Sequence, residues 1–393
     1  MGCGKTTSII NLINASDQDT KFLYITPYLT EVERVIEGCP DKKFCQPKEM
    51  GTKKRGIKKL FERGSNIVST HALFRCFDKE IIDLAYSGDY VLIMDEVADV
   101  VSPLDITQDD ADNILEKYTE VVDGNTLRWM APSYEGKFEG YKRLCDLGCI
   151  CIYGDNTMLQ LFPISTFSGF KEIYILTYLF DAQIQKYYFD YYGVEYDYLY
   201  VTRDGNKENS YQLTREPQSY DYSRYSQLIS IFNNEKLNKI GEMNGSLSKG
   251  WYERNQNNRL MTTLKNNLSN FFKNYTKTGT NQNLWTTFKK YQSILKGKGY
   301  TKGFLSSNAR ATNEYKDRTA VAYCLNRYFN PVIKNFFIQK GVEVDEDAYA
   351  LSEMLQFIFR SAIREGRSIQ VYIPSKRMRA LLEAWLVEIN KGN

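Results

Sequence analysis

The chain has 393 residues, of which 42% are hydrophobic and 25% charged, and its net charge at neutral pH is +3. This length predicts two or three domains with cores of their own, and so small a net charge excludes an argument for nucleic-acid binding from overall charge alone. Eight scattered cysteines, with neither an apolar run of membrane-spanning length nor a leader segment, predict a cytoplasmic protein without a membrane partner.

Residues 1–7 read MGCGKTT, which matches the second half of a phosphate-binding loop, G-x-x-x-x-G-K-[ST]. In such a loop the backbone N–H groups surround nucleotide phosphates, the lysine reaches the terminal phosphates, and the Ser/Thr hydroxyl binds magnesium. The same residues also fit an acceptor pattern for myristoylation, but the rest of the chain offers partners for a phosphate loop and no membrane-binding patch. We therefore predict a nucleotide site followed by a helix over residues 7–15, and the strand and first glycine of the motif would lie before residue 1. The predicted nucleotide-binding residues are Gly2, Gly4, Lys5, Thr6 and Thr7, with Thr6 also a magnesium ligand.

Five short apolar runs predict buried strands, and the segments between them have helical patterns. The strands are expected at residues 22–25, 66–69, 90–94, 149–153 and 173–177. The segment 108–147 is expected to be largely helical. This alternation predicts a parallel sheet covered on both faces over residues 1–185.

The strand at 90–94 continues directly into Asp95 and Glu96. A buried strand that ends in two acids places carboxylates at the carboxyl edge of a sheet, where ligands bind in open α/β folds. Asp95 is the predicted magnesium ligand, and Glu96 is the predicted catalytic base that takes a proton from the attacking water. The two motifs complement each other, because one binds phosphate and the other supplies metal and base.

Residues 186–225 are rich in tyrosine and contain turn signals, so we expect a connection between domains there. Its aromatic rings suit base stacking as well as packing in a core. Residues 226–300 are polar and mostly helical in pattern, which predicts a helical insertion. The sequence leaves two interpretations of its basic cluster: the lysines contact phosphate groups, or they form a solvated helix face. That cluster consists of Lys265, Lys273, Lys277, Lys289, Lys290, Lys296, Lys298 and Lys302.

Residues 301–393 predict a second α/β domain, with short strands at 303–307 and 368–373 and a closing helix over 375–389. One helix is expected over residues 347–364. On that helix Gln356, Arg360 and Arg364 would share a stripe, since they lie four residues apart. Such a stripe suits anion recognition, because guanidinium groups remain charged and donate in a planar fork.

In their order, these motifs resemble superfamily-two helicases, the DEAD-like group of nucleic-acid-dependent ATPases, and especially the compact forms of phages and mobile elements. The matching segments are 4–6, 25–27, 69–71, 95–98, 176–177, 308–313 and 356–364. The chain departs from the family pattern at Ala98, where an acid or histidine is usual, and at Phe359, where glycine usually precedes the first arginine.

The resemblance implies two RecA-like P-loop domains that bind ATP and Mg²⁺ between them, with nucleic acid across both. Lys5 and Thr6 would bind phosphate and magnesium, and Asp95 and Glu96 would keep the roles given above. The remaining catalytic residues implied by the family are Gln356, Arg360 and Arg364, which would approach the γ-phosphate.

The expected function is an ATP-dependent helicase or translocase in a bacterial or phage-infected cell. Nucleic acid is the expected partner, with DNA preferred over RNA, and replication or recombination proteins are further candidates. The alternative is a nucleic-acid-binding protein on a helicase scaffold that does not turn over ATP, because the phosphate loop is incomplete. A small-molecule kinase would leave the arginines of segment 356–364 unexplained.

Overall fold

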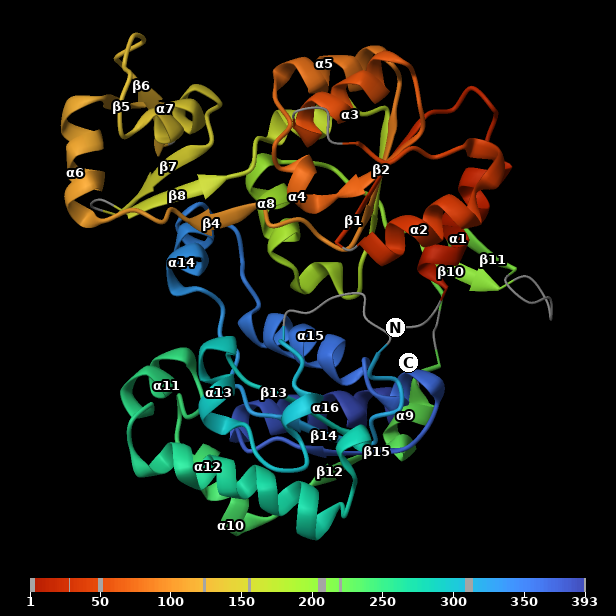
Figure 1. Ribbon diagram of the computed structural model, residues 1–393, viewed down its shortest axis with the longest axis vertical. Helices are drawn as coiled ribbons and strands as arrows, with labels where there is room; N and C mark the ends of the chain where they lie inside the picture. Colours follow the sequence, from red (N-terminus) through yellow and green to blue (C-terminus); the bar gives the residue numbers. More distant parts are fainter. Residues whose placement is uncertain are drawn as a thin grey trace. The chain divides into compact units, whose positions relative to one another are not determined.

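The computed structural model describes residues 4–27, 29–48, 52–122, 125–154, 157–203, 210–218, 221–307 and 314–391. The chain divides into two compact units, which we call the N-terminal unit (residues 4–216 and 330–344) and the C-terminal unit (residues 217–329 and 345–391). Each contains a four-stranded parallel sheet with helices packed against it (Figure 1). The predicted α/β fold class with parallel sheets is confirmed.

The sheet of the N-terminal unit has the strand order β2-β1-β3-β9, and all neighbours are parallel. Its strands are β1 (Phe22–Thr26), β2 (Ile67–Thr70), β3 (Val91–Asp95) and β9 (Glu172–Leu176). Four of the five strands expected in this region are therefore present in one sheet. Because the strands are parallel, the polar residues that follow them meet at one edge.

Helices cover both faces of this sheet, as the nearly continuous apolar sequence of its central strands requires. They are α1 (Lys5–Ala15), α2 (Leu29–Gly38), α3 (Lys53–Glu62), α4 (His71–Phe74), α5 (Lys79–Ser87) and α8 (Ile184–Tyr192). On one face, Ile9 and Ile13 of α1 and Val35 of α2 are fully buried against Phe22 and Tyr24 of β1.

A separate five-stranded antiparallel sheet, which we call the antiparallel module, lies in sequence between β3 and β9. It contains β4 (Val101–Pro103), β5 (Thr119–Val122), β6 (Thr126–Trp129), β7 (Ile150–Tyr153) and β8 (Thr157–Leu161), in the order β4-β8-β7-β6-β5, with helices α6 (Gln108–Lys117) and α7 (Glu139–Asp146). The assignment of strand 149–153 to the parallel sheet was thus wrong. The connection from β7 to β8 is too short for a parallel crossover, so the two strands form an antiparallel pair. The segment 108–147 contains β5 and β6 as well as its helices.

The tyrosine-rich stretch forms part of the N-terminal unit rather than a connection, because this unit extends to Glu216. Tyr187 and Tyr188 lie on α8 and are 1% and 0% exposed, so these two rings pack in the core and are not available to bases. The stretch continues into an antiparallel hairpin of β10 (Tyr200–Arg203) and β11 (Tyr211–Thr214).

The sheet of the C-terminal unit has the order β12-β15-β14-β13 and is also fully parallel. Its strands are β12 (Ile229–Phe232), β13 (Asn283–Thr286), β14 (Ala320–Tyr323) and β15 (Ile369–Tyr372). The helices of this unit are α9 (Ser223–Leu228), α10 (Glu235–Asn238), α11 (Lys249–Asn255), α12 (Arg259–Asn270), α13 (Gln292–Leu295), α15 (Glu346–Ile358) and α16 (Lys376–Asn390).

Residues 226–300 are helical over much of their length, as expected, but they do not stand apart as an insertion. They supply both β12 and β13, and Trp285 of β13 is buried together with Leu264 and Leu268 of α12 in one core. On the other face of the sheet, the ring of Tyr323 packs against Phe357 of α15 with the centroids 5.6 Å apart. The helical segment is therefore one layer of the second α/β unit.

Helix α14 (Pro331–Gln339), which the sequence did not predict, lies between β14 and α15 in the chain but belongs to the N-terminal unit. It begins with Pro331, and the side chain of Asn330 accepts hydrogen bonds from the first-turn amides. Its Phe336 ring packs against Tyr191 and its Phe337 ring against Tyr187, with centroid distances of 5.3 Å and 6.0 Å. From residue 4 to residue 391 the chain thus passes between the two units three times.

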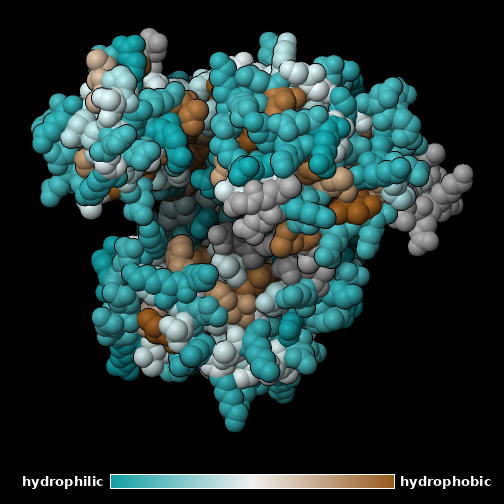
Figure 2. Space-filling model, turned by 45° about the horizontal axis from the view of Figure 1, so that its top comes forward, coloured by the Kyte–Doolittle hydropathy of each residue, from teal (hydrophilic) through white to brown (hydrophobic). Residues whose placement is uncertain are grey.

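Within the described ranges, no helix combines the length and the apolar character that crossing a membrane requires. Hydrophilic side chains cover most of the face turned to the viewer in Figure 2.

Candidate functional site

The first turn of α1 carries the described residues of the predicted phosphate loop. Gly4 precedes the helix with a φ of 83°, and Lys5, Thr6 and Thr7 form its first turn. No acidic side chain lies in this turn, so its backbone N–H groups and the positive end of the helix dipole can attract an anion. The predicted residue Gly2 lies outside the described residues.

Asp95, the last residue of β3, faces both anionic and cationic neighbours. The pKa of Asp95 is raised to about 7, mainly by burial and also by the carboxylates of Glu96 and Glu31, whereas Lys5 and Arg34 act in the opposite direction. The structure therefore brings Lys5 of the loop and the two predicted acids to the same edge of the sheet. A cation bound here would relieve the repulsion between the carboxylates.

Glu96 occupies a backbone conformation that is unusual for a residue with a side chain, with a φ of 68°. The segment after β9 supports it twice: the Glu96 amide donates to the carbonyl oxygen of Leu176 at 2.9 Å, and the Thr177 hydroxyl donates to Oε2 of Glu96 at 3.3 Å. Strain of this kind persists when surrounding contacts determine the conformation, and it is common at functional sites.

Gln185 of α8 provides a third support for the same turn. The buried amide of Ala98 donates to Oε1 of Gln185 at 2.8 Å, and Gln185 is fully buried. Since an amide N–H needs an acceptor, this bond fixes which way the Gln185 side chain is oriented. Ala98 is one of the two positions at which the chain departs from the helicase pattern, and here a side chain from a distant helix holds it.

The only histidine of the chain supports the other side of the turn. His71 begins α4 directly after β2, and its Nε2 lies 2.9 Å from the carbonyl oxygen of Asp95. Because that oxygen can only accept, Nε2 carries the proton. His71 therefore orients the end of β3.

Sequence reasoning missed Glu31 and Arg34 of α2, which form an ion pair at 3.2 Å and both influence Asp95. A signal was present, because Glu31 is an acid in the first turn of the helix that follows β1 and the expected segment 25–27. No local signal marked Gln185, which is 87 positions from Ala98.

Tyr211 of β11 was also missed as a neighbour of the phosphate loop. A Cβ atom on Gly4 would lie 2.4 Å from Cδ1 of Tyr211, so the ring lies directly against the glycine. The side-chain amide of Asn11 donates to the carbonyl oxygen of Tyr211 at 2.9 Å, which fastens the hairpin to α1. Only glycine fits at position 4, for its positive φ as well as for this contact.

In the C-terminal unit, the predicted stripe of one glutamine and two arginines is not on a single helix. Helix α15 ends at Ile358, so that Gln356 lies in its last turn, Arg360 in the turn after it, and Arg364 in a short 3-10 helix, η10 (Ala362–Glu365). The physical reason is that other hydrogen bonds replace those of the helix: the Ser361 hydroxyl donates to the carbonyl oxygen of Ile358 at 2.6 Å, and the Ala362 amide donates to the carbonyl oxygen of Arg318 at 2.9 Å.

The three side chains of this segment also differ in exposure. Gln356 is 8% exposed and its Nε2 lies 3.4 Å from the hydroxyl of Ser352, whereas Arg364 is exposed and Arg360 is intermediate. The expected segment 308–313 lies outside the described residues.

No group of three or more metal-ligating side chains occurs in the part of the chain that the structure describes. Cys145, Cys149 and Cys151 are buried thiols, and burial raises the pKa of each to about 12. The donor set at Asp95 and Thr6 does fit Mg²⁺, because this ion commonly binds one or two protein oxygens and completes its shell with water and phosphate.

The fold and this site define an α/β protein with two parallel-sheet units and a Gly-Lys-Thr segment at a helix N-terminus near paired acids. The family model described as the YonV C-terminal Rossmann-like domain matches residues 223–386, a range that includes β12 to β15. The chain belongs to the family of the SPbeta prophage-derived uncharacterized protein YonV of Bacillus subtilis (strain 168). It is 41% identical to that protein over 402 residues, which cover 98% of this chain and 97% of the relative. A prophage-derived relative agrees with the phage type expected from the sequence.

Proposed function

We propose that this protein is a nucleic-acid-dependent ATPase, with the activity of a helicase or translocase, that acts in the cytoplasm of the host cell. The observation that supports this proposal most strongly is the meeting of Lys5, Asp95 and Glu96 at the carboxyl edge of a parallel sheet, beside the first turn of α1. A phosphate group needs a cation and N–H donors, its metal needs a carboxylate, and the attacking water needs a base. All of these groups are present at this edge.

Each residue has a separate role in the proposed reaction. The first-turn amides of α1 and the Lys5 ammonium bind the phosphates, and Thr6 and Asp95 hold the metal. A magnesium ion held by these residues would supply positive charge that neutralises the phosphate oxygens. Glu96 accepts the proton of that water, and Thr177 and Leu176 hold Glu96 in position for it. The roles of Gln356, Arg360 and Arg364 rest on the resemblance to helicases alone.

One observation favours the alternative, a nucleic-acid-binding protein without ATP turnover. The ring of Tyr211 lies against Gly4, where it limits the space beside the phosphate loop. If the hairpin remains there, ATP does not reach the loop, and the affinity for nucleic acid is the same with and without ATP.

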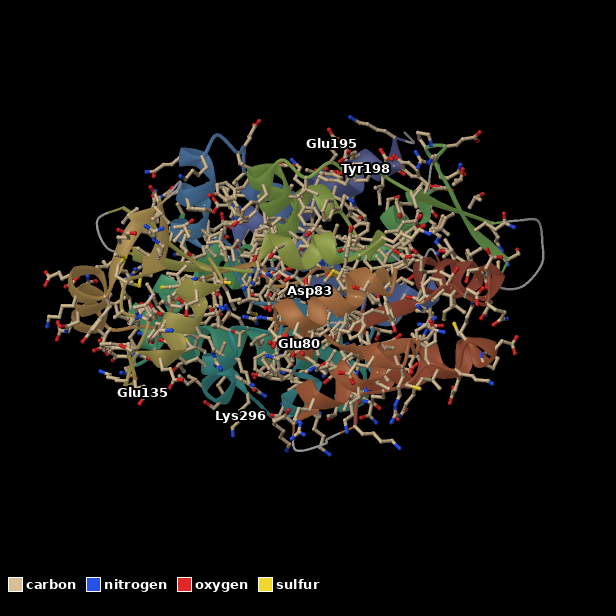
Figure 3. The ribbon with its side chains drawn as sticks, turned by 90° about the horizontal axis from the view of Figure 1, so that it is seen from above. Glu80, Asp83, Glu135, Glu195, Tyr198 and Lys296 are labelled. Atoms are coloured by element: carbon tan, nitrogen blue, oxygen red, sulfur yellow. The ribbon has the colours of Figure 1, made fainter. Side chains whose placement is uncertain are left out.

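The test is ATP hydrolysis by the purified full chain with and without single-stranded DNA or RNA. We expect nucleic acid to stimulate hydrolysis, and Glu96→Gln to lower the turnover rate by about a hundredfold or more, because the general base is lost. The matched control is Glu80→Gln on α5, since Glu80 (labelled in Figure 3) is an exposed glutamate that pairs with Lys58 of α3.

Binding of a fluorescent ATP analogue separates the two candidate functions. Lys5→Ala should weaken this binding, whereas Glu96→Gln should leave it close to that of the unchanged protein. A chain that binds nucleic acid but shows no stimulated hydrolysis, and in which Glu96→Gln changes nothing, would support the alternative and exclude the ATPase.

A further inference from the structure

A long stretch of the C-terminal unit carries positive charge without any compensating acid. Residues 254–307 contain ten lysine or arginine residues and no aspartate or glutamate, although the whole chain has a net charge of only +3. Protein surfaces usually intersperse both signs, because neighbouring like charges repel. We call the exposed lysines of this stretch the lysine face. They are Lys273, Lys277, Lys289, Lys290, Lys296, Lys298 and Lys302.

Some lysines elsewhere in the chain form ion pairs with acids. In the antiparallel module, Lys137 pairs with Asp110 at 2.8 Å and Lys142 with Asp146 at 3.0 Å. Among the ion pairs of the described residues, none involves a member of the lysine face. Their charge is therefore available to an external anion.

The segments that carry the face are held together by one buried tyrosine. The Tyr300 hydroxyl donates to the carbonyl oxygen of Leu295 at 2.7 Å, and the Tyr300 carbonyl accepts from the indole of Trp285 at 2.8 Å. Helices α12 and α13 also contact each other. These contacts fix the segments that carry the lysines next to β13, the edge strand of its sheet, and Lys296 projects outward at the rim of the view in Figure 3.

The aromatic residues between these lysines do not reach solvent. Phe271, Phe272 and Trp285 are 0%, 2% and 0% exposed, so they form the core under the face and cannot stack on bases. Tyr275 is 45% exposed, but its ring packs against Phe232 at 4.7 Å. Contact through lysine alone reads phosphate groups and not base identity.

We propose that the lysine face binds the phosphate backbone of nucleic acid, without sequence preference. This inference extends the proposed function, in which nucleic acid is the second ligand, by assigning that ligand a surface outside the motifs of the ATP site. Asparagine, threonine, serine and glycine fill most of the positions between the lysines. Such residues add hydrogen bonds to phosphates, whereas a membrane-binding surface would present apolar anchors there.

The test is the salt dependence of oligonucleotide binding by the full chain without ATP. The variant combines Lys289→Gln, Lys290→Gln, Lys296→Gln and Lys298→Gln, which removes four charges from exposed positions. With labelled oligodeoxythymidine, we expect binding to weaken about tenfold or more, and the slope of log K against log salt to fall by about two to three.

The matched control removes the same charge from lysines that pair with aspartates. It combines Lys54→Gln, Lys137→Gln, Lys142→Gln and Lys186→Gln, which pair with Asp78, Asp110, Asp146 and Asp190. This control should keep the slope of the unchanged protein. Far-ultraviolet circular dichroism establishes that both variants fold.

Three results would overturn the inference. The first is no binding of oligonucleotide by the unchanged protein, and the second is equal slopes in both variants. The third is that the variant of the lysine face loses binding to vesicles of anionic lipid but keeps its binding to oligonucleotide. A chain without ATPase activity whose oligonucleotide binding depends on the lysine face would reject the proposed ATPase and leave this inference intact. An active ATPase with equal slopes in both variants would reject this inference and leave the proposed ATPase intact.

Discussion

At the scale of single residues, the site depends on side chains that hold the turn after β3. Glu96 has a positive φ, and the contacts that keep it there come from Leu176, Thr177 and Gln185, all at or after the end of β9. We predict that Gln185→Leu leaves the Ala98 amide without its acceptor, which costs about 1–3 kcal/mol and lets the turn relax. If the chain hydrolyses ATP, the turnover rate should fall while the KM for ATP changes little, because Gln185 lies away from the phosphates.

Hydrogen exchange tests this prediction without reference to activity. The Ala98 amide should be protected in the unchanged protein, exposed in Gln185→Leu, and protected again in Gln185→Glu, which keeps an acceptor oxygen. Tyr188→Phe is the matched control, since it removes a buried hydrogen bond from the same helix, to the carbonyl oxygen of Phe162, and leaves the turn unchanged. Equal exchange at Ala98 in all variants would show that Gln185 does not hold this turn.

The sequence predicted the candidate site residues that belong to a local motif and missed those that contact the site from distant segments. Lys5 follows a glycine in a phosphate-loop pattern, and Asp95 and Glu96 follow an apolar strand, so local order was enough to find them. Gln185 and Tyr211 carry no such signal, because their contacts with Ala98 and Gly4 exist only after the chain has folded.

At the scale of secondary-structure elements, local patterns predicted the positions of the strands better than they predicted which strands pair in a sheet. The run at residues 149–153 is as apolar as those of β1 and β3, but its hairpin with β8 places it in the antiparallel module. The end of α15 at Ile358 was also hidden, since no glycine or proline occurs before Gly366. The contacts made at this end are tertiary ones, since Phe359 packs against Tyr225 and Trp385 and the Ala362 amide donates to the carbonyl oxygen of Arg318.

The packing of α1 against the β10–β11 hairpin leads to a second prediction. Gly4→Ala should destabilise the protein by more than about 1–2 kcal/mol, because alanine is unfavourable at a φ of 83° and its Cβ would overlap the Tyr211 ring. In the double variant with Tyr211→Ala the overlap is gone. The free energy of unfolding should therefore fall by less than the sum of the losses in the two single variants. Urea unfolding of the single and double variants measures this coupling.

The control for this prediction is Gly140→Ala in α7, where a Cβ would meet no atom within 4 Å. That change should be neutral or stabilise by up to about 1 kcal/mol, as alanine favours helix. Strict additivity of Gly4→Ala and Tyr211→Ala would mean that the ring does not lie against the loop in solution.

At the scale of the whole molecule, the order of elements in the chain does not reveal which unit each one joins. Helix α14 follows β14 of the C-terminal unit, yet its buried residues Ile333, Phe336 and Phe337 complete the N-terminal unit. Its apolar pattern could have predicted a helix, but not the side chains of α8 that it covers. The stability of the N-terminal unit therefore depends on residues far along the chain.

This dependence gives the third prediction. Phe337→Ala should destabilise the N-terminal unit by about 3–5 kcal/mol, because it removes a fully buried ring that packs against Tyr187. Ile338→Ala is the matched control on the same helix, since Ile338 is 49% exposed and should contribute within about 0.5 kcal/mol. Hydrogen exchange of the full chain, followed in peptides from α8 and from β15, locates the effect. Faster exchange in α8 with unchanged exchange in β15 is the expected result, whereas faster exchange confined to β15 would mean that α14 supports the C-terminal unit instead.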